Sequence, residues 1–150
     1  MKIKLSVSDD CYEEVESFFL NHGIETDEDS EFILIQKDKY PGHLSVKIPD
    51  TGEKLHISVD DIILIDSYGH TVEVCTENMI YHTADRLYQL IKILDPNQFI
   101  RVSNSVIISK SKVREISPTF SMKFILKMQN GIRVDVTRSY YNSFKEYFHI

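Results

Sequence analysis

Alternating apolar and polar residues fill most of the chain from residue 31 onward and predict a series of short β-strands. The period of two covers residues 32–36, 44–48, 55–58, 62–67, 71–75 and 79–82, and it returns at residues 99–102, 105–108, 113–117, 123–128 and 133–136. Turn-forming pairs such as Pro41-Gly42 and Tyr68-Gly69 separate these segments. Asn130-Gly131 lies between the last two, so we expect those strands to form a hairpin.

The amino-terminal part has a different pattern, in which an extended segment over residues 2–8 precedes an amphipathic helix. Candidates for the helix N-cap are Ser8, Asp9 and Asp10, and Gly23 is expected just beyond the C-terminus. One face of this helix carries the apolar residues Tyr12, Val15, Phe18 and Phe19. We therefore expect a small strand-helix-strand extension over residues 1–43, followed by the main domain over residues 44–150.

Two further segments have the helical period. Residues 83–94 place apolar side chains on one face at Leu87, Leu90, Ile91 and Leu94, with Thr83 as the expected N-cap and Asp95-Pro96 as the stop. A last helix is expected to begin near Ser139, with an inner side formed by Tyr140, Phe144, Tyr147 and Phe148. We interpret these aromatic residues as core residues and not as platforms for stacked bases. Strands outnumber helices, so the sequence predicts a mainly β fold after a small α+β extension.

Composition limits the classes of protein to consider. Hydrophobic residues make up 42% of the 150 residues, a globular value, and no run reaches the roughly 20 apolar residues of a membrane span. The start MKIKLSVSDD lacks the continuous apolar stretch of a signal peptide, so we expect a cytoplasmic protein without direct membrane insertion. Cys11 and Cys75 form no CxxC pair and the histidines lack metal-ligand spacing, so we expect neither a metal site nor another cofactor.

Charge is distributed unevenly along the chain. Residues 99–150 carry nine basic and three acidic residues, a net charge of +6, whereas residues 1–98 carry eight basic and twenty acidic ones, a net charge of −12. The overall charge of −6 hides this division. A basic segment of this kind indicates a surface that meets a polyanion.

Four segments, in this order, resemble the LytTR domain, the mostly β DNA-binding module of LytR/AlgR-type bacterial transcription regulators. They are VDDIILIDSYGHTVEV, ADRLYQLIKIL, FIRVSNSVIISKSKV and NGIRVDVTRSYYNSFKEYF, within residues 44–148. The resemblance implies an elongated fold of short, mostly antiparallel sheets with short helices. It also implies that loops and strand ends, instead of a recognition helix, enter successive major grooves of duplex DNA. The extension looks like that of stand-alone, response-regulator-like members without a receiver domain, so phosphorylation control is not implied.

Position in the family assigns the contacts to bases to His70, Asn104 and Arg138. Their chemistry suits base edges, because arginine donates a bidentate pair to guanine, asparagine both donates to and accepts from adenine, and histidine donates to an acceptor. Contacts to the DNA backbone are expected from Arg101, Ser103, Lys110, Lys112, Lys123 and Ser139. The sequence departs from the family at Ser103, where a His or Arg is common, and near Ser109, where an Asn is common.

Other interpretations of these residues remain open. A histidine beside a turn, such as His70, is usually just solvated, and Asn104 is equally suited to satisfying backbone groups in a turn. Lys110, Lys112 and Arg114 also fit an edge strand that charge protects from aggregation. The sequence has no glycine-rich phosphate loop or nucleophile elbow, so we expect no catalytic residues and no enzyme. The alternative classes are an acidic protein-interaction module and a small ligand-binding domain without catalysis.

The expected partner is double-stranded DNA with repeated promoter sites. We also expect a homodimer, at least on DNA, because paired half-sites multiply affinity through effective concentration. The 43-residue extension has too few residues to form an independent core, which makes it the candidate dimerisation unit. A regulatory membrane protein or another protein partner remains an alternative for the same extension.

Overall fold

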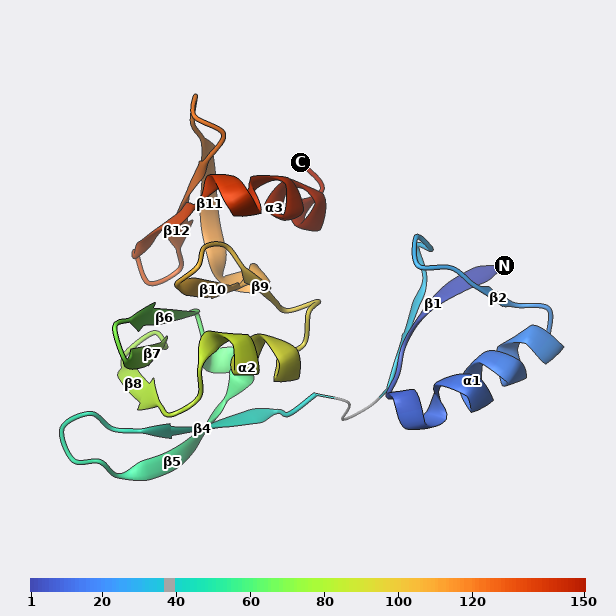
Figure 1. Ribbon diagram of the computed structural model, residues 1–150, viewed down its shortest axis with the longest axis horizontal. Helices are drawn as coiled ribbons and strands as arrows, with labels where there is room; N and C mark the ends of the chain where they lie inside the picture. Colours follow the sequence, from blue (N-terminus) through green and yellow to red (C-terminus); the bar gives the residue numbers. More distant parts are fainter. Residues whose placement is uncertain (37–39) are drawn as a thin grey trace. The chain divides into compact units, whose positions relative to one another are not determined.

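Two compact units make up the chain, Met1–Lys39 and Tyr40–Ile150. The computed structural model describes residues 1–36 and 40–150, and Figure 1 shows both units as ribbons. Each unit has a hydrophobic core of its own. The expectation that the amino-terminal extension is too short for an independent core is wrong, because its helix packs on its sheet around a small apolar cluster. The division that the sequence leads us to expect, after residue 43, lies a few residues further along the chain.

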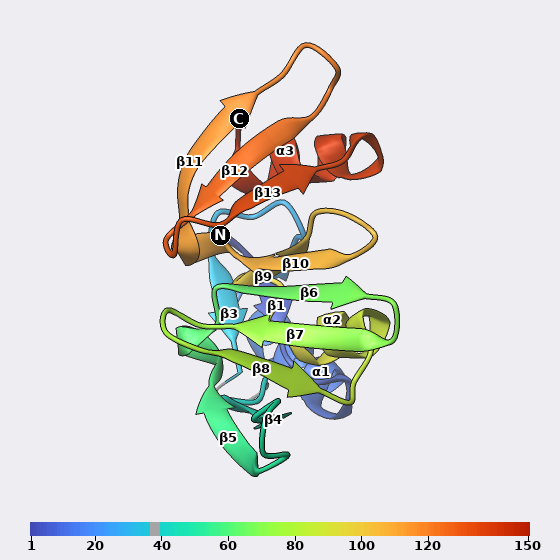
Figure 2. The same ribbon diagram turned by 90° about the vertical axis from the view of Figure 1, so that its left-hand side faces the viewer.

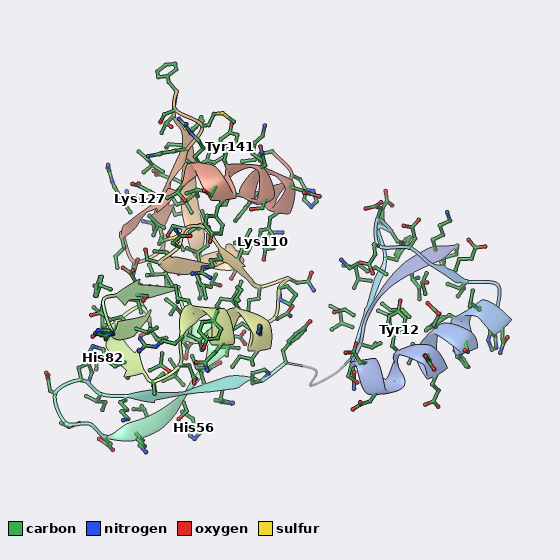
Figure 3. All side chains as sticks on the ribbon, in the orientation of Figure 1. Tyr12, His56, His82, Lys110, Lys127 and Tyr141 are labelled. Carbon is green, nitrogen blue, oxygen red and sulfur yellow. The ribbon has the colours of Figure 1, made fainter. Side chains whose placement is uncertain are left out.

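The first unit is built on a parallel three-stranded sheet. β1 (Lys2–Ser6) is its middle strand, with β2 (Glu25–Thr26) on one side and β3 (Ile33–Ile35) on the other. α1 (Asp9–Asn21) connects β1 to β2, as parallel strands require a crossover. The alternation of β1 directs Ile3 and Leu5 into the core with α1, and Val7 joins them just after the strand. Tyr12 of that helix lies between helix and strand (Figure 3).

The ends of α1 agree with the sequence. Ser8 occupies the N-cap position, although its hydroxyl makes no capping bond and lies 3.3 Å from the Cys11 sulfur instead. Two acidic residues in the first turn interact favourably with the helix dipole. Gly23 follows the C-cap with φ of 76°, a left-handed conformation that glycine adopts without steric cost.

The second unit contains a seven-stranded antiparallel sheet. Its order is β5-β4-β8-β7-β6-β10-β9. The strands are β4 (His43–Lys47), β5 (Lys54–Ser58), β6 (Leu64–Tyr68), β7 (Thr71–Cys75), β8 (Ile80–Thr83), β9 (Phe99–Arg101) and β10 (Val106–Ser109), with a 3-10 turn η1 (Val59–Asp61) before β6. Each of these strands overlaps a segment that the alternation predicts, and the ends differ by up to two residues.

α2 (Leu87–Ile93) packs on one face of this sheet through the predicted apolar residues Leu87 and Leu90. The prediction that Thr83 caps this helix is wrong, because Thr83 belongs to β8 and pairs with Val72. The helix begins four residues later, where the Arg86 N–H donates to the Gln89 side chain at 2.8 Å. Sheet pairing of the residues before the helix thus overrides their capping preference.

A second antiparallel sheet follows in the order β11-β12-β13. Its strands are β11 (Val113–Pro118), β12 (Phe124–Met128) and β13 (Arg133–Val136), preceded by the 3-10 turn η2 (Lys110–Lys112). The predicted hairpin at Asn130-Gly131 is confirmed, with Gly131 in the left-handed conformation at φ of 86°. A 3-10 turn η3 (Arg138–Tyr140) then leads into α3 (Tyr141–Phe148), where Phe144 is fully buried.

Strands β6 and β10 belong to both cores of the second unit. Ile65 and Ile107 pack with α2 in one cluster, whereas Leu64 and Ile108 pack with Phe144 and the second sheet in the other. Successive side chains of a strand point to opposite faces, so a strand covered on both faces is apolar throughout. The run Ile62 to Ile65 has this character and joins the two layers.

Candidate nucleic-acid interface

An open cleft of about 810 Å³ lies along one edge of the second unit. It is lined by the end of β6, the β9–β10 loop, β13 and the start of η3. Figure 2 shows the β6–β7 turn, the β9–β10 loop and the segment between β13 and α3 at this same edge. The edge is formed by turns and strand ends, and neither of the two α-helices of this unit contributes to the cleft lining.

Several of the sequence-predicted residues meet in this cleft. Asn104, Lys123, Arg138 and Ser139 line it, and all four side chains are exposed. Ser103 lines it as well but is only 7% exposed. Two residues assigned to base contacts, separated by more than thirty positions in the sequence, are thereby brought to one surface.

His70 lies in the two-residue β6–β7 turn, next to the cleft. The neighbouring Gly69 has φ of 57°, as the first central position of a type II′ hairpin turn requires. The His70 carbonyl accepts a hydrogen bond from the Arg86 guanidinium at 3.2 Å. His70 itself is exposed. Arg86 therefore fixes the backbone of the turn and leaves the imidazole at the surface.

The loop that carries Asn104 is held by hydrogen bonds from three directions. Arg101 donates from Nε to the Ser103 carbonyl at 3.2 Å and from Nη2 to the Asn104 carbonyl at 2.6 Å. The Ser103 hydroxyl accepts from the Ser105 N–H at 3.2 Å. Tyr140 of η3 donates its hydroxyl proton to Asn104 Oδ1 at 3.1 Å. The side-chain amide is therefore oriented before any ligand arrives.

Two of the predicted backbone contacts lie outside the cleft. The Lys110 ammonium lies 4.8 Å from the centre of the Tyr147 ring and 5.7 Å from that of Phe148, beside α3 (Figure 3). Lys112 lines a separate, smaller cleft together with Asp61 and Glu77. The structure thus does not bring these lysines together with Arg138, and their contacts to DNA stay predictions.

The cleft has a mixed electrostatic character. Its bases are Lys123, Arg133 and Arg138, and its acids are Asp66 and Asp135. Partial burial, together with the charge of Glu73 on the neighbouring strand, raises the pKa of the Asp66 carboxyl above its usual value. Three bases face two acids, so the net charge of the cleft lining is only weakly positive.

Three residues of this surface were not predicted as site residues, namely Arg86, Arg133 and Tyr140. Arg133 follows the Asn-Gly turn in the basic segment, so the charge count alone gave a signal for it. No local pattern marks Arg86 or Tyr140, because each acts on a residue at least sixteen positions away. Within residues 1–36 and 40–150, no group of three or more His, Cys, Asp or Glu side chains is placed to hold a metal ion.

The antiparallel strands and the loop-lined cleft define a β-rich binding module that presents turns to its ligand. Comparison with known proteins specifies the module further. The model of the LytTr DNA-binding domain matches residues 52–149, and the chain belongs to this family. Its mainly β fold of short, mostly antiparallel sheets is therefore the fold that the resemblance implied.

Related proteins agree with this assignment. The transcriptional regulatory protein LytR of Staphylococcus aureus strain N315 is 31% identical over 103 residues, which are 68% of this chain and 41% of LytR. The sensory transduction protein LytT of Bacillus subtilis strain 168 is 31% identical over 106 residues, which are 71% of this chain and 41% of LytT. The chain thus spans less than half the length of these relatives.

A solved structure has the same fold. It is a LytTr DNA-binding domain from Bacillus cereus, which superposes with a TM-score of 0.69 at 22% identity and covers 73% of this chain and 99% of that domain. None of the helices in the described ranges combines the length and the apolar character needed to cross a membrane.

Proposed function

We propose that this chain is a cytoplasmic bacterial transcription regulator that binds duplex DNA sequence-specifically and catalyses no reaction. The observation that carries the proposal is the convergence of Asn104 and Arg138 on one loop-lined cleft in a LytTr-family unit. Both side chains are exposed and both have the donor geometry that base edges in the major groove require. DNA is therefore the partner that this surface fits best.

The side chains of the cleft have different roles in this proposal. Arg138 donates to guanine O6 and N7, Asn104 contacts adenine, and His70 reaches a neighbouring base or phosphate from its turn. Lys123 and Ser139 contact phosphate oxygens from the same cleft. Arg101 and Ser103 act mainly by shaping the Asn104 loop, because both already bond within it. Lys110 and Lys112 contact phosphates only where the duplex extends past the cleft.

Selection of bound sites from a random duplex library identifies the operator and tests the proposal directly. Affinity for the selected site and for random duplex is then measured at several salt concentrations. A protein that neutralises phosphates loses affinity steeply as salt rises, with a slope proportional to the number of phosphates contacted. Binding that selects no sequence, or that does not respond to salt, would contradict the proposal.

Arg138→Ala and Lys112→Ala form a matched pair within this test. The Arg138 change should cost about 1–3 kcal/mol on the selected site, relax the preference at one base pair and leave random duplex nearly unaffected. The Lys112 change should weaken both duplexes equally and lower the salt slope by about one unit if this lysine contacts phosphate. Equal losses on both duplexes for Arg138→Ala would make it a phosphate contact. An unchanged melting temperature controls for folding.

We further propose that the chain acts as a homodimer, at least on DNA. One cleft offers few base-contacting side chains, whereas two copies on adjacent half-sites add their contacts and gain effective concentration. The first unit is compact in its own right and is the candidate for the contact between copies. Sedimentation shows whether two copies associate.

A further inference from the structure

The edge strand β3 of the first unit is apolar and exposed along its whole length. Ile33 is 45%, Leu34 36% and Ile35 50% exposed, and the preceding Phe32 is 58% exposed. Native edge strands usually carry charges or prolines that prevent pairing with another chain. The other edge of this sheet, β2, follows that rule, since it is two residues long and contains Glu25.

The backbone of β3 has an open hydrogen-bonding side. Its register with β1 pairs Lys4 with Ile33 and Ser6 with Ile35. The Lys4 N–H donates to the Phe32 carbonyl at 2.7 Å, and the Gln36 N–H donates to the Ser6 carbonyl at 3.1 Å. Because alternate residues of a strand bond to the same neighbour, the N–H and C=O groups of Ile33 and Ile35 point to the open side.

Charge distinguishes this strand from the rest of its unit. Residues 9–31 contain ten acidic residues and no lysine or arginine, whereas residues 32–36 contain no charged residue at all. A basic partner would find no acid on the strand to pair with. A neutral, apolar strand is the matching partner, and β3 of a second copy is such a strand.

We propose that β3 pairs with β3 of a second copy, antiparallel, across a two-fold axis at Leu34. This deepens the proposed homodimer, rests on it, and names the seam. In this register Ile33 of each copy faces Ile35 of the other and exchanges both backbone hydrogen bonds with it, so every open group of the edge is satisfied. The sheet becomes continuous across the two copies.

Side chains complete the seam on both faces. Leu34 pairs in register with Leu5, whose side chain faces α1, so Leu34 of the two copies meet on the helix-covered face. Ile33 and Ile35 lie on the opposite face and form cross-strand aliphatic pairs between the copies. So short a seam buries less than the roughly 1,200 Å² of a stable interface. The free dimer is therefore weak, and two adjacent half-sites on DNA strengthen it.

Sedimentation of the full chain without DNA, over a wide concentration series, tests whether it self-associates. Ile35→Pro is the informative variant, because it removes an N–H that faces the open side and leaves the bonds to β1 in place. The unmodified chain should dimerise at high concentration, and Ile35→Pro should remain a monomer. Retained salt-dependent binding of Ile35→Pro to random duplex shows an intact second unit and separates this test from that of DNA binding.

A disulfide trap tests the register. In a non-hydrogen-bonded antiparallel pair the two Leu34 Cα atoms lie about 4.5 Å apart, within the range of about 4.4–6.8 Å that a disulfide spans. Leu34→Cys is made in a Cys11→Ser background, where the remaining Cys75 is buried. Ile93→Cys is the control, because Ile93 of α2 is 43% exposed and lies in the other unit.

Under mild oxidation Leu34→Cys should form a covalent dimer at least roughly tenfold faster than Ile93→Cys, since pairing raises the effective thiol concentration. Adding Ile35→Pro to the Leu34→Cys variant should reduce its rate of cross-linking to that of Ile93→Cys. A chain that stays monomeric throughout overturns the proposal, as does an Ile35→Pro variant that dimerises normally. Equal cross-linking rates for the two cysteine variants overturn it too.

Discussion

The hydrogen bond between Tyr140 and Asn104 gives a sharp test of how the cleft is organised. Tyr140→Phe removes the hydroxyl that donates to Asn104 Oδ1 at 3.1 Å and keeps the ring that packs against the second core. A neutral hydrogen bond contributes about 0.5–1.5 kcal/mol, and this one is exposed, so about 0.5–1 kcal/mol is expected. On the selected DNA site, that is about a two- to fivefold loss of affinity.

Fluorescence anisotropy with the selected site and with a random duplex measures this loss, and a double-mutant cycle assigns it. If Tyr140 acts by orienting the amide, Tyr140→Phe should have no effect once Asn104→Ala is present. The unmodified chain and Tyr140→Phe should bind random duplex with equal affinity. A loss of equal size in the Asn104→Ala background, or on random duplex, would refute the orienting role and assign the hydroxyl to a phosphate contact.

Three further predictions concern stability. Phe144→Ala empties a fully buried site and should lower the free energy of unfolding by about 3–5 kcal/mol in urea titration; a loss below 1 kcal/mol would contradict the packing. The buried Tyr147 hydroxyl has no hydrogen-bond partner among the described residues, so Tyr147→Phe should leave the melting temperature unchanged or raise it. Burial raises the pKa of the Cys75 thiol to about 11 from 9.0, so the folded state retains the proton longer than the unfolded state. Stability should therefore fall as pH rises from 9 towards 11, and less steeply in Cys75→Ala, as measured by urea midpoints.

Most of the β architecture could be predicted from the sequence because it rests on local periodicity. The alternation at residues 71–75 and the Asn130-Gly131 turn each determine their element with little help from the rest of the fold. The start of α2 could not be predicted in this way, since Thr83 has a capping side chain but its backbone is committed to β7. Tertiary pairing decides such positions.

The candidate site was less accessible to sequence reasoning. His70, Asn104 and Arg138 came from the resemblance, because an exposed polar residue in a turn has no periodicity that marks it. The contacts that orient the cleft join residues such as Tyr140 and Asn104, which only the folded chain brings together. Basic charge drew attention to Lys123, which lines the cleft together with Arg133, and to Lys110, whose ammonium lies against the rings of α3. The contacts of these residues with DNA stay predictions.

The candidate base-contacting side chains all belong to turns and loop ends, and none of them is a member of either core. Substitution at His70, Asn104 or Arg138 therefore changes the surface offered to DNA without opening a cavity or removing packed atoms. The DNA sequence that the protein prefers can therefore change without a loss of folding stability. Such a scaffold allows related genes to diverge in target site after duplication, and it offers the engineer three positions at which a randomised library should consist largely of folded proteins.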